Sequence, residues 1–177
     1  ITIFIPVKDE VVGLSHLVQD YEENIWGEEK LSSRISFIFI IDGRTTDESK
    51  IKATKILEMN GQISSKNQII DQKDTHGKGA AIGQAIDIWK KSPSSFVFFL
   101  DADGSHSFLD IRAILEELNN GSDVVSGSRF MSHSNLIDNT HFNDMSQMGK
   151  LHIFGNKLLS KISSLKNKRK ITDLCTG

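Results

Sequence analysis

Two aspartates with one residue between them are the first candidates for chemistry in this chain. Asp101 and Asp103 directly follow the apolar run at residues 96–100. Side chains alternate along extended backbone, so carboxylates two residues apart point the same way and can hold one hard cation at the end of a strand. That arrangement suits the handling of a diphosphate. Because aspartates are also common in solvated turns, the pair alone leaves both interpretations open.

The elements that would position this pair follow from the hydrophobic pattern. Apolar runs rich in Ile, Val and Phe alternate with segments of helical periodicity, which predicts alternating strands and helices. The predicted strands are residues 1–5, 35–41, 68–70, 96–100 and 123–126, and the predicted helices are residues 12–24, 48–59, 78–91, 108–119 and 148–165. Nearly continuous apolar strands are typical of a mostly parallel sheet covered by helices on both faces. We therefore predict an α/β, Rossmann-like fold.

Composition predicts one ordinary globular domain over residues 1–177, with 38% hydrophobic and 25% charged residues. The formal net charge of -2 gives no reason to expect nucleic-acid binding, which usually shows as a strongly basic face. Cys175 stands alone, so no internal disulfide forms, as is typical of the cytoplasm. We see no signal peptide and no membrane-spanning run, and we expect a cytoplasmic domain truncated at both ends.

Charged and polar residues follow four of the five predicted strands. Ligands of open parallel sheets bind beyond the carboxyl ends of the strands, where these residues would meet. The four stretches are residues 6–10, 42–47, 101–106 and 127–129. Asp9 and Asp47 also suit the starts of helices. Four such stretches on one rim favour a binding site.

A glycine pair flanks Lys78 at the start of a predicted helix, in the stretch His76-Gly77-Lys78-Gly79. Free backbone N–H groups and the helix dipole favour an anion at that position. The spacing matches neither a P-loop nor a dinucleotide-binding fingerprint. The small residues could equally serve close packing of the helix on the sheet.

Six short motifs occur in one order along the chain: Ile5-Pro6-Val7-Lys8-Asp9-Glu10, Ile41-Asp42-Gly43-Arg44-Thr45-Thr46-Asp47, Gly77-Lys78-Gly79-Ala80-Ala81, Asp101-Ala102-Asp103-Gly104-Ser105-His106, Gly127-Ser128-Arg129-Phe130 and Asp173-Leu174-Cys175-Thr176-Gly177. Together they resemble the inverting glycosyltransferases of family 2, which have the GT-A fold. Within that family they are most similar to the polyprenyl-phosphate branch, whose members resemble dolichyl-phosphate mannose or glucose synthases.

The resemblance implies a role for each matching residue. The implied contacts with a nucleoside-diphosphate-sugar are Pro6, Lys8, Glu10, Ile41, Asp42, Lys78, Asp101, Ala102, Asp103 and Arg129. It implies Mn2+ or Mg2+ as cofactor, held chiefly by Asp103 with help from Asp101 and Ser105. Arg129 and Lys150 would meet the phosphate of a lipid acceptor.

Three departures from the family pattern bear on specificity. Lys8 replaces a tyrosine, and Gly43 replaces the second aspartate of a D-D pair, so the choice between uracil and guanine stays open. In the stretch around Asn156, where related enzymes carry paired arginines, this chain offers Lys150, His152 and Lys157. A lysine attracts phosphate as a point charge, so the acceptor can differ.

The implied reaction is an in-line displacement at the anomeric carbon with inversion. A cation on Asp101 and Asp103 would neutralise charge on the leaving diphosphate. A lipid phosphate is already ionised and needs little general-base help, whereas a hydroxyl acceptor requires a carboxylate. Asp173 is the candidate base, although it could instead only shape the acceptor loop.

A basic cluster lies near the C-terminus. Its members are Lys161, Lys166, Lys168, Arg169 and Lys170. Such a cluster can contact anionic lipid at a membrane surface, or it can simply be a solvated helix end.

Two other classes of protein remain as alternatives. A sugar nucleotidyltransferase would carry a glycine-rich loop directly after the first strand, where this chain has Lys8-Asp9-Glu10. A non-catalytic module that binds a nucleotide-sugar, or a receiver-like regulatory domain, would show no turnover of any donor.

Overall fold

The computed structural model describes residues 1–59, 67–73, 76–128, 150–168 and 170–173. The chain divides into two compact units, residues 1–109 and 110–177, and each is described by itself.

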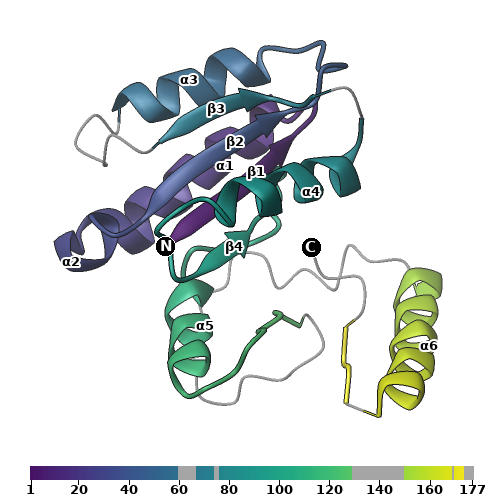
Figure 1. Cartoon of the computed structure of the whole chain (residues 1–177). Coiled ribbons are helices and arrows are strands. Elements are labelled where there is room, and N and C mark those ends of the chain that lie inside the picture. Colours follow the sequence, from purple (N-terminus) through teal and green to yellow (C-terminus); the bar gives the residue numbers. More distant parts are fainter. Residues whose placement is uncertain (60–66, 74–75, 129–149, 169, 174–177) are drawn as a thin grey trace. The chain divides into compact units, whose positions relative to one another are not determined.

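The first unit is built on a four-stranded parallel sheet (Figure 1). Its strands are β1 (Thr2–Val7), β2 (Ser36–Ile41), β3 (Gln68–Asp71) and β4 (Val97–Phe99), in the order β3-β2-β1-β4. All three pairings are parallel, which confirms the predicted sheet. The carboxyl ends of the strands therefore share one edge.

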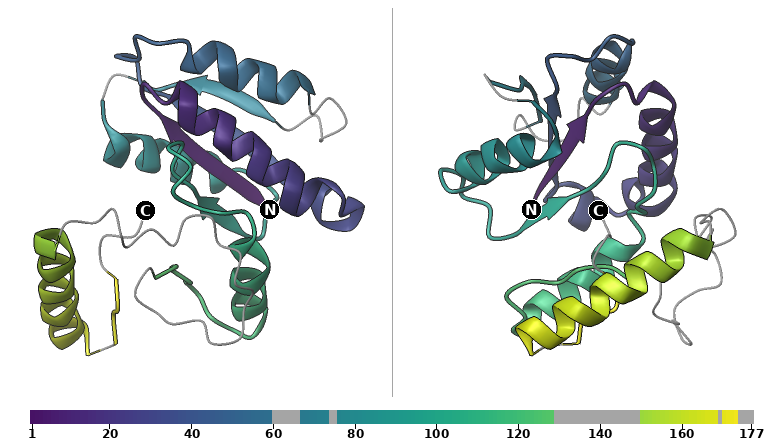
Figure 2. Two further views of the ribbon diagram at one scale, coloured as in Figure 1. Left: turned by 180° about the vertical axis from the view of Figure 1, so that it is seen from behind. Right: turned by 90° about the vertical axis from the view of Figure 1, so that its right-hand side faces the viewer.

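Helices cover both faces of this sheet (Figure 2). They are α1 (Val11–Tyr21), its continuation as a π-helical turn η1 (Glu22–Trp26), α2 (Glu29–Ser32), α3 (Ser49–Met59) and α4 (Lys78–Trp89). The long helices α1 and α3 lie against one face, and α4 lies against the other. The predicted helix at residues 12–24 thus corresponds to α1 and most of η1, while α2 had no counterpart in the prediction.

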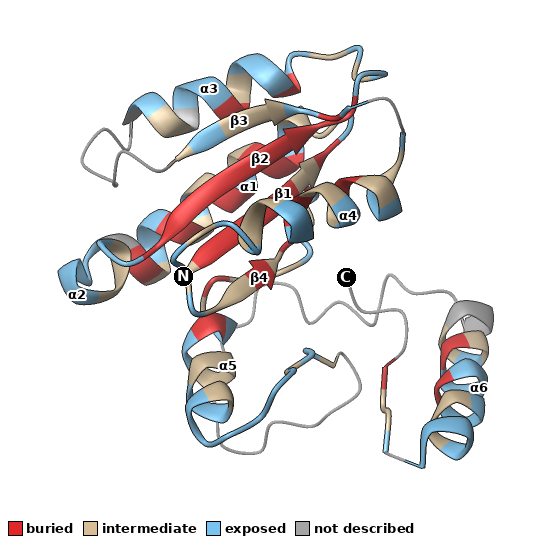
Figure 3. Ribbon diagram, viewed as in Figure 1, coloured by how far each residue is buried: buried red, intermediate tan, exposed pale blue. Residues whose placement is uncertain are grey.

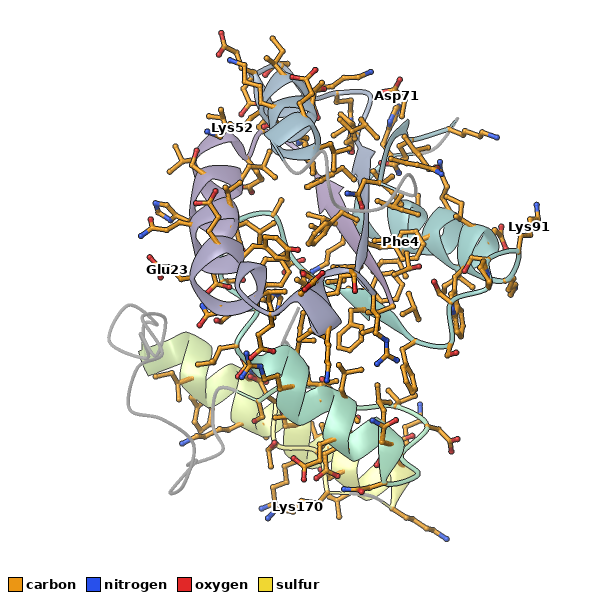
Figure 4. All side chains as sticks on the ribbon, turned by 90° about the vertical axis from the view of Figure 1, so that its left-hand side faces the viewer. Phe4, Glu23, Lys52, Asp71, Lys91 and Lys170 are labelled. Atoms are coloured by element: carbon orange, nitrogen blue, oxygen red, sulfur yellow. The ribbon has the colours of Figure 1, made fainter. Side chains whose placement is uncertain are left out.

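The central strands are buried on both faces (Figure 3). On the α4 side, Phe4 packs with Ile38, Ile40, Ala81 and Ala85, and Figure 4 shows Phe4 in the interior, with Lys91 projecting outward just beyond the end of α4. On the opposite face, the rings of Tyr21, Phe37 and Phe108 contact one another edge to face. Alternation of side chains along each strand supplies both cores, which explains why the strands are apolar almost throughout.

The second unit contains α5 (Asp110–Asn119) and α6 (Lys150–Asn167), each within two residues of its predicted bounds. The predicted strand at residues 123–126 is wrong, because these residues form no strand and Val124 is 85% exposed. A run with only two apolar residues buries too little to hold a strand in place without a neighbour. Within the described ranges, none of the helices has the length and apolar character needed to cross a bilayer.

Candidate active site

The loops after β1 and β2 are joined by hydrogen bonds between Asp9 and Thr46, which we call the Asp9 brace. Asp9 adopts a left-handed conformation, with φ 53°, and its Oδ1 accepts the Thr46 N–H at 2.7 Å and the Thr46 hydroxyl at 3.2 Å. Backbone hydrogen bonds, first that of Thr46, lower the pKa of Asp9. The next residue, Glu10, donates its N–H to Oγ of the fully buried Ser49 at 2.7 Å. The Asp9 brace and the hydrogen bond to Ser49 therefore fix the position of Glu10 at this edge of the sheet.

Asp42, directly after β2, is buried, and both of its carboxylate oxygens accept hydrogen bonds. The Arg44 guanidinium donates Nε to Oδ1 at 3.0 Å and Nη2 to Oδ2 at 2.8 Å. The Gly77 N–H also donates to Oδ2, at 2.9 Å. The Arg44 guanidinium, followed by the backbone hydrogen bonds from Arg44 and Gly77, holds the pKa of Asp42 well below its usual range. Asp42 thus ties the end of β2 to the start of α4.

The start of α4 is in turn tied to the end of β4. Lys78 is the first residue of α4, and its Nζ lies 2.6 Å from Oδ1 and 2.9 Å from Oδ2 of Asp101. The predicted phosphate-binding lysine and the first predicted acidic residue therefore meet directly. Both side chains remain partly open to solvent, at 48% and 25% exposure.

The loop that carries the acidic pair is a tight turn. Gly104 has φ 79°, which glycine adopts without steric cost. The Ser105 N–H donates to Asp103 Oδ1 at 2.8 Å, and the Asp101 N–H donates to Nδ1 of His106 at 3.1 Å. Asp103 itself is exposed. The turn thus leaves the second Oδ atom of Asp103 available to a ligand at the rim.

Helix α1 supports this turn through a glycine. A Cβ atom placed on Gly13 would lie 2.2 Å from the Ala102 carbonyl oxygen and 2.5 Å from Cα of Asp103. The close approach of α1 therefore depends on the missing side chain, and Gly13 sets the position of the acidic pair.

Electrostatics shows that the rim carboxylates lie near one another. Burial raises the pKa of Glu10, and repulsion from Asp103, Asp47 and Asp101 raises it further. Carboxylate oxygens are the ligands that Mg2+ and Mn2+ prefer. Among the described residues, no three His, Cys, Asp or Glu side chains come close enough to hold a metal by themselves. These carboxylates therefore suit a cation that completes its coordination shell with oxygen atoms of a bound substrate.

The other predicted nucleotide-sugar residues of the first unit differ in accessibility. Pro6 is half-buried on β1 and Lys8 is exposed just beyond it, whereas Ile41 and Ala102 are buried. The buried pair could contact a ligand only through backbone atoms. Ser105 is exposed next to Asp103.

In the second unit, Asp173 is buried and accepts a hydrogen bond from Asn156 Nδ2 at 2.6 Å. Thr172, its neighbour, donates or accepts a hydroxyl hydrogen bond with Ser128 at 2.8 Å. Ser128 of the predicted motif that begins at Gly127 therefore contacts the residue directly before Asp173. Lys150 begins α6, and Arg129 lies outside the described residues.

Three further residues take part in this site: Gly13, which lies outside the six motifs, and Arg44 and His106, which lie within two of them but were given no role. A signal existed for Gly13, because a glycine inside an otherwise apolar helical pattern often marks close approach of another backbone. For Arg44 and His106 the sequence offers no comparable signal, because their partners are set by loop conformation.

A parallel sheet covered on both faces, with acidic residues at the carboxyl ends of its strands, defines an open α/β domain whose ligands are expected at that edge. The sequence matches the family described as "Glycosyl transferase family 2" over residues 2–176, so the chain belongs to glycosyl transferase family 2. This membership and the sheet confirm the predicted GT-A fold class.

Two known proteins show the extent of the likeness. The chain is 23% identical over 179 residues to "Glycosyltransferase AglJ" of Haloferax volcanii, a match that covers 100% of this chain and 48% of that protein. The chain thus spans about half the length of this relative. A solved structure, "Mannosyltransferase PcManGT from Pyrobaculum calidifontis in complex with GDP-Man and Mn2+", matches with a TM-score of 0.45 and 16% identity, over 58% of this chain and 27% of that one.

Proposed function

We propose that this domain transfers a sugar from a nucleoside-diphosphate-sugar to an acceptor with inversion at the anomeric carbon. The observation that carries the proposal is the rim of the parallel sheet in a family 2 domain, where Asp101, Asp103 and Glu10 gather beside Lys78. Diphosphate is a poor leaving group unless its charge is neutralised, and this rim supplies both the carboxylates for a cation and a lysine for an anion.

The residues divide the work by position. Asp103 would hold a divalent cation, Mn2+ or Mg2+, with Asp101 and Ser105 beside it. When bound, such a cation supplies charge neutralisation to the leaving diphosphate. Lys8 and Glu10, which follow β1, would border the base and ribose. Gly13 and the turn at Gly104 keep the acidic pair in place while the donor binds.

The acceptor we propose is a polyprenyl phosphate. Its phosphate is ionised at neutral pH and attacks without a strong base, and Arg129 and Lys150 would bind it. If the acceptor is instead a hydroxyl, Asp173 is the base, and its hydrogen bond from Asn156 orients the carboxylate. The adjacency of Ser128 and Thr172 supports a shared acceptor region for these two motifs.

A donor screen tests the function. UDP-, GDP- and dTDP-sugars are titrated onto the protein with and without Mn2+, and the tightest binder is then incubated with polyprenyl phosphate. We expect Mn2+-dependent binding of one nucleotide class and transfer of its sugar to the lipid. Binding without transfer to any lipid or glycan acceptor would favour a non-catalytic binding module, and the absence of all binding would refute the proposal.

We further propose that α6 contacts the cytoplasmic face of an anionic membrane. This helix turns polar residues such as Asn156 and Ser160 inward, where they are hydrogen-bonded. Its exposed apolar stripe consists of Phe154, Leu158, Ile162 and Leu165. At 100° per residue, Lys157 and Lys161 border one side of the stripe and Lys166 the other, and Lys168 directly follows the end of α6. An apolar stripe edged by lysines matches the charge and depth of an anionic lipid surface.

Vesicle flotation tests this contact. We expect retention on vesicles that contain phosphatidylserine and partial release as salt rises, since each lysine near such a surface contributes about 1 kcal/mol. Lys161→Glu with Lys168→Glu should abolish retention, whereas the control pair Lys90→Glu with Lys91→Glu, in the first unit, should not. Equal retention on neutral vesicles, or none on either kind, would contradict the proposal.

A further inference from the structure

The ion pair between Lys78 and Asp101 sits where the proposed donor must bind. Lys78 Nζ contacts both carboxylate oxygens of Asp101, at 2.6 Å and 2.9 Å. Asp101 is separated from Asp103 by one residue, and both repel Glu10. Lys78 therefore neutralises part of the charge that Glu10, Asp101 and Asp103 share in the unloaded protein.

A cation that uses Asp101 must compete with this ammonium group. The two oxygens that Lys78 occupies are the ones that Asp101 would offer to a divalent ion. An ammonium group and a divalent cation in the same place repel each other strongly. Lys78 must therefore leave Asp101 before that carboxylate can take part in metal or donor binding.

The Lys78 side chain is open enough to solvent to move from Asp101 to the diphosphate of the proposed donor. Its side chain is 48% exposed, and it stands in the first turn of the twelve-residue helix α4. The loop before it is anchored independently, because the Gly77 N–H is held by Asp42. Lys78 can thus exchange partners by side-chain rotation alone, while the backbone of α4 stays fixed.

We propose that Lys78 is an exchangeable counter-ion, which occupies Asp101 in the empty site and transfers to the donor's diphosphate when metal and nucleotide bind. This inference rests on the proposed function. It makes Lys78 a positioning residue with two opposite effects: the residue weakens binding of the metal alone and strengthens binding of the nucleotide alone. A lysine that only stabilised the loop would produce neither effect.

Two titrations on the whole chain separate these effects in Lys78→Met, which keeps an unbranched side chain one atom shorter than lysine and removes the charge. Mn2+ alone is titrated and followed by electron paramagnetic resonance. We expect affinity to rise roughly two- to fivefold, the range that corresponds to loss of an exposed ion pair. UDP and GDP are then titrated without metal, and we expect weaker binding of whichever nucleotide the wild-type chain prefers. Lys78→Arg should restore nucleotide binding.

The matched control is Lys50→Met, which removes another exposed ion pair of the first unit, that of Lys50 with Asp71 at 2.6 Å. It should change neither titration. Mn2+ affinity that is unchanged or weaker in Lys78→Met would overturn the inference, as would the absence of Mn2+ binding in both proteins. The proposed function is judged separately by sugar transfer in the wild-type chain, so failure of the inference can be told apart from failure of the function.

Discussion

Replacing Asp103 with asparagine is expected to remove Mn2+-dependent nucleotide binding, with a loss of affinity of about 100-fold or more, since even the neighbours of metal ligands cost 10- to 100-fold when changed. Asparagine retains an oxygen that can accept the Ser105 N–H, now at 2.8 Å, so the turn should survive. Only the charge is lost. The measurement is calorimetric titration of the preferred nucleotide with and without Mn2+.

The matched control for this variant is Asp87→Asn, which changes an exposed aspartate within α4, away from the strand ends. It should bind nucleotide as the wild-type chain does. Binding of nucleotide without metal should not weaken in Asp103→Asn, because removal of a negative charge favours an anion. Superimposable Mn2+-dependent curves for Asp103→Asn and the wild type would show that another residue holds the cation.

Replacing Gly13 with alanine is expected to destabilise the first unit by about 1–3 kcal/mol, the usual cost of overpacking. The new methyl group would lie 2.2 Å from a backbone oxygen and 2.5 Å from Cα of Asp103, and backbone cannot rotate away as a side chain can. For a chain of this size each kcal/mol lowers the melting temperature by about 2–4 °C. The shift of the turn should also weaken Mn2+ binding, which gives a second readout.

Gly83→Ala is the matched control, because Gly83 lies inside α4 with no atom within 4 Å of the added Cβ. Alanine there should stabilise the protein by about 0.5–1 kcal/mol through helix propensity alone. If Gly13→Ala melts at or above the wild-type temperature, α1 does not set the position of the acidic pair.

Sequence reasoning succeeded where local pattern and physics agree. The strands β1 and β2 were predictable because burial on both faces leaves an apolar run that few other structures produce. It failed at residues 123–126, where two valines resembled a short strand but Val124 is exposed. A four-residue stretch with two apolar residues carries no information about whether a neighbouring strand exists.

In the candidate site, too, local sequence predicts some features and packing between distant elements decides others. The sequence by itself determined the residue types at the strand ends, and hence the acidic pair, because the carboxyl ends of parallel strands must share one edge. Only the tertiary structure decided the partners: Arg44 on Asp42, Lys78 on Asp101 and α1 against Ala102. Loop conformation and helix approach set these contacts, and both depend on packing between elements far apart in the chain rather than on any local pattern.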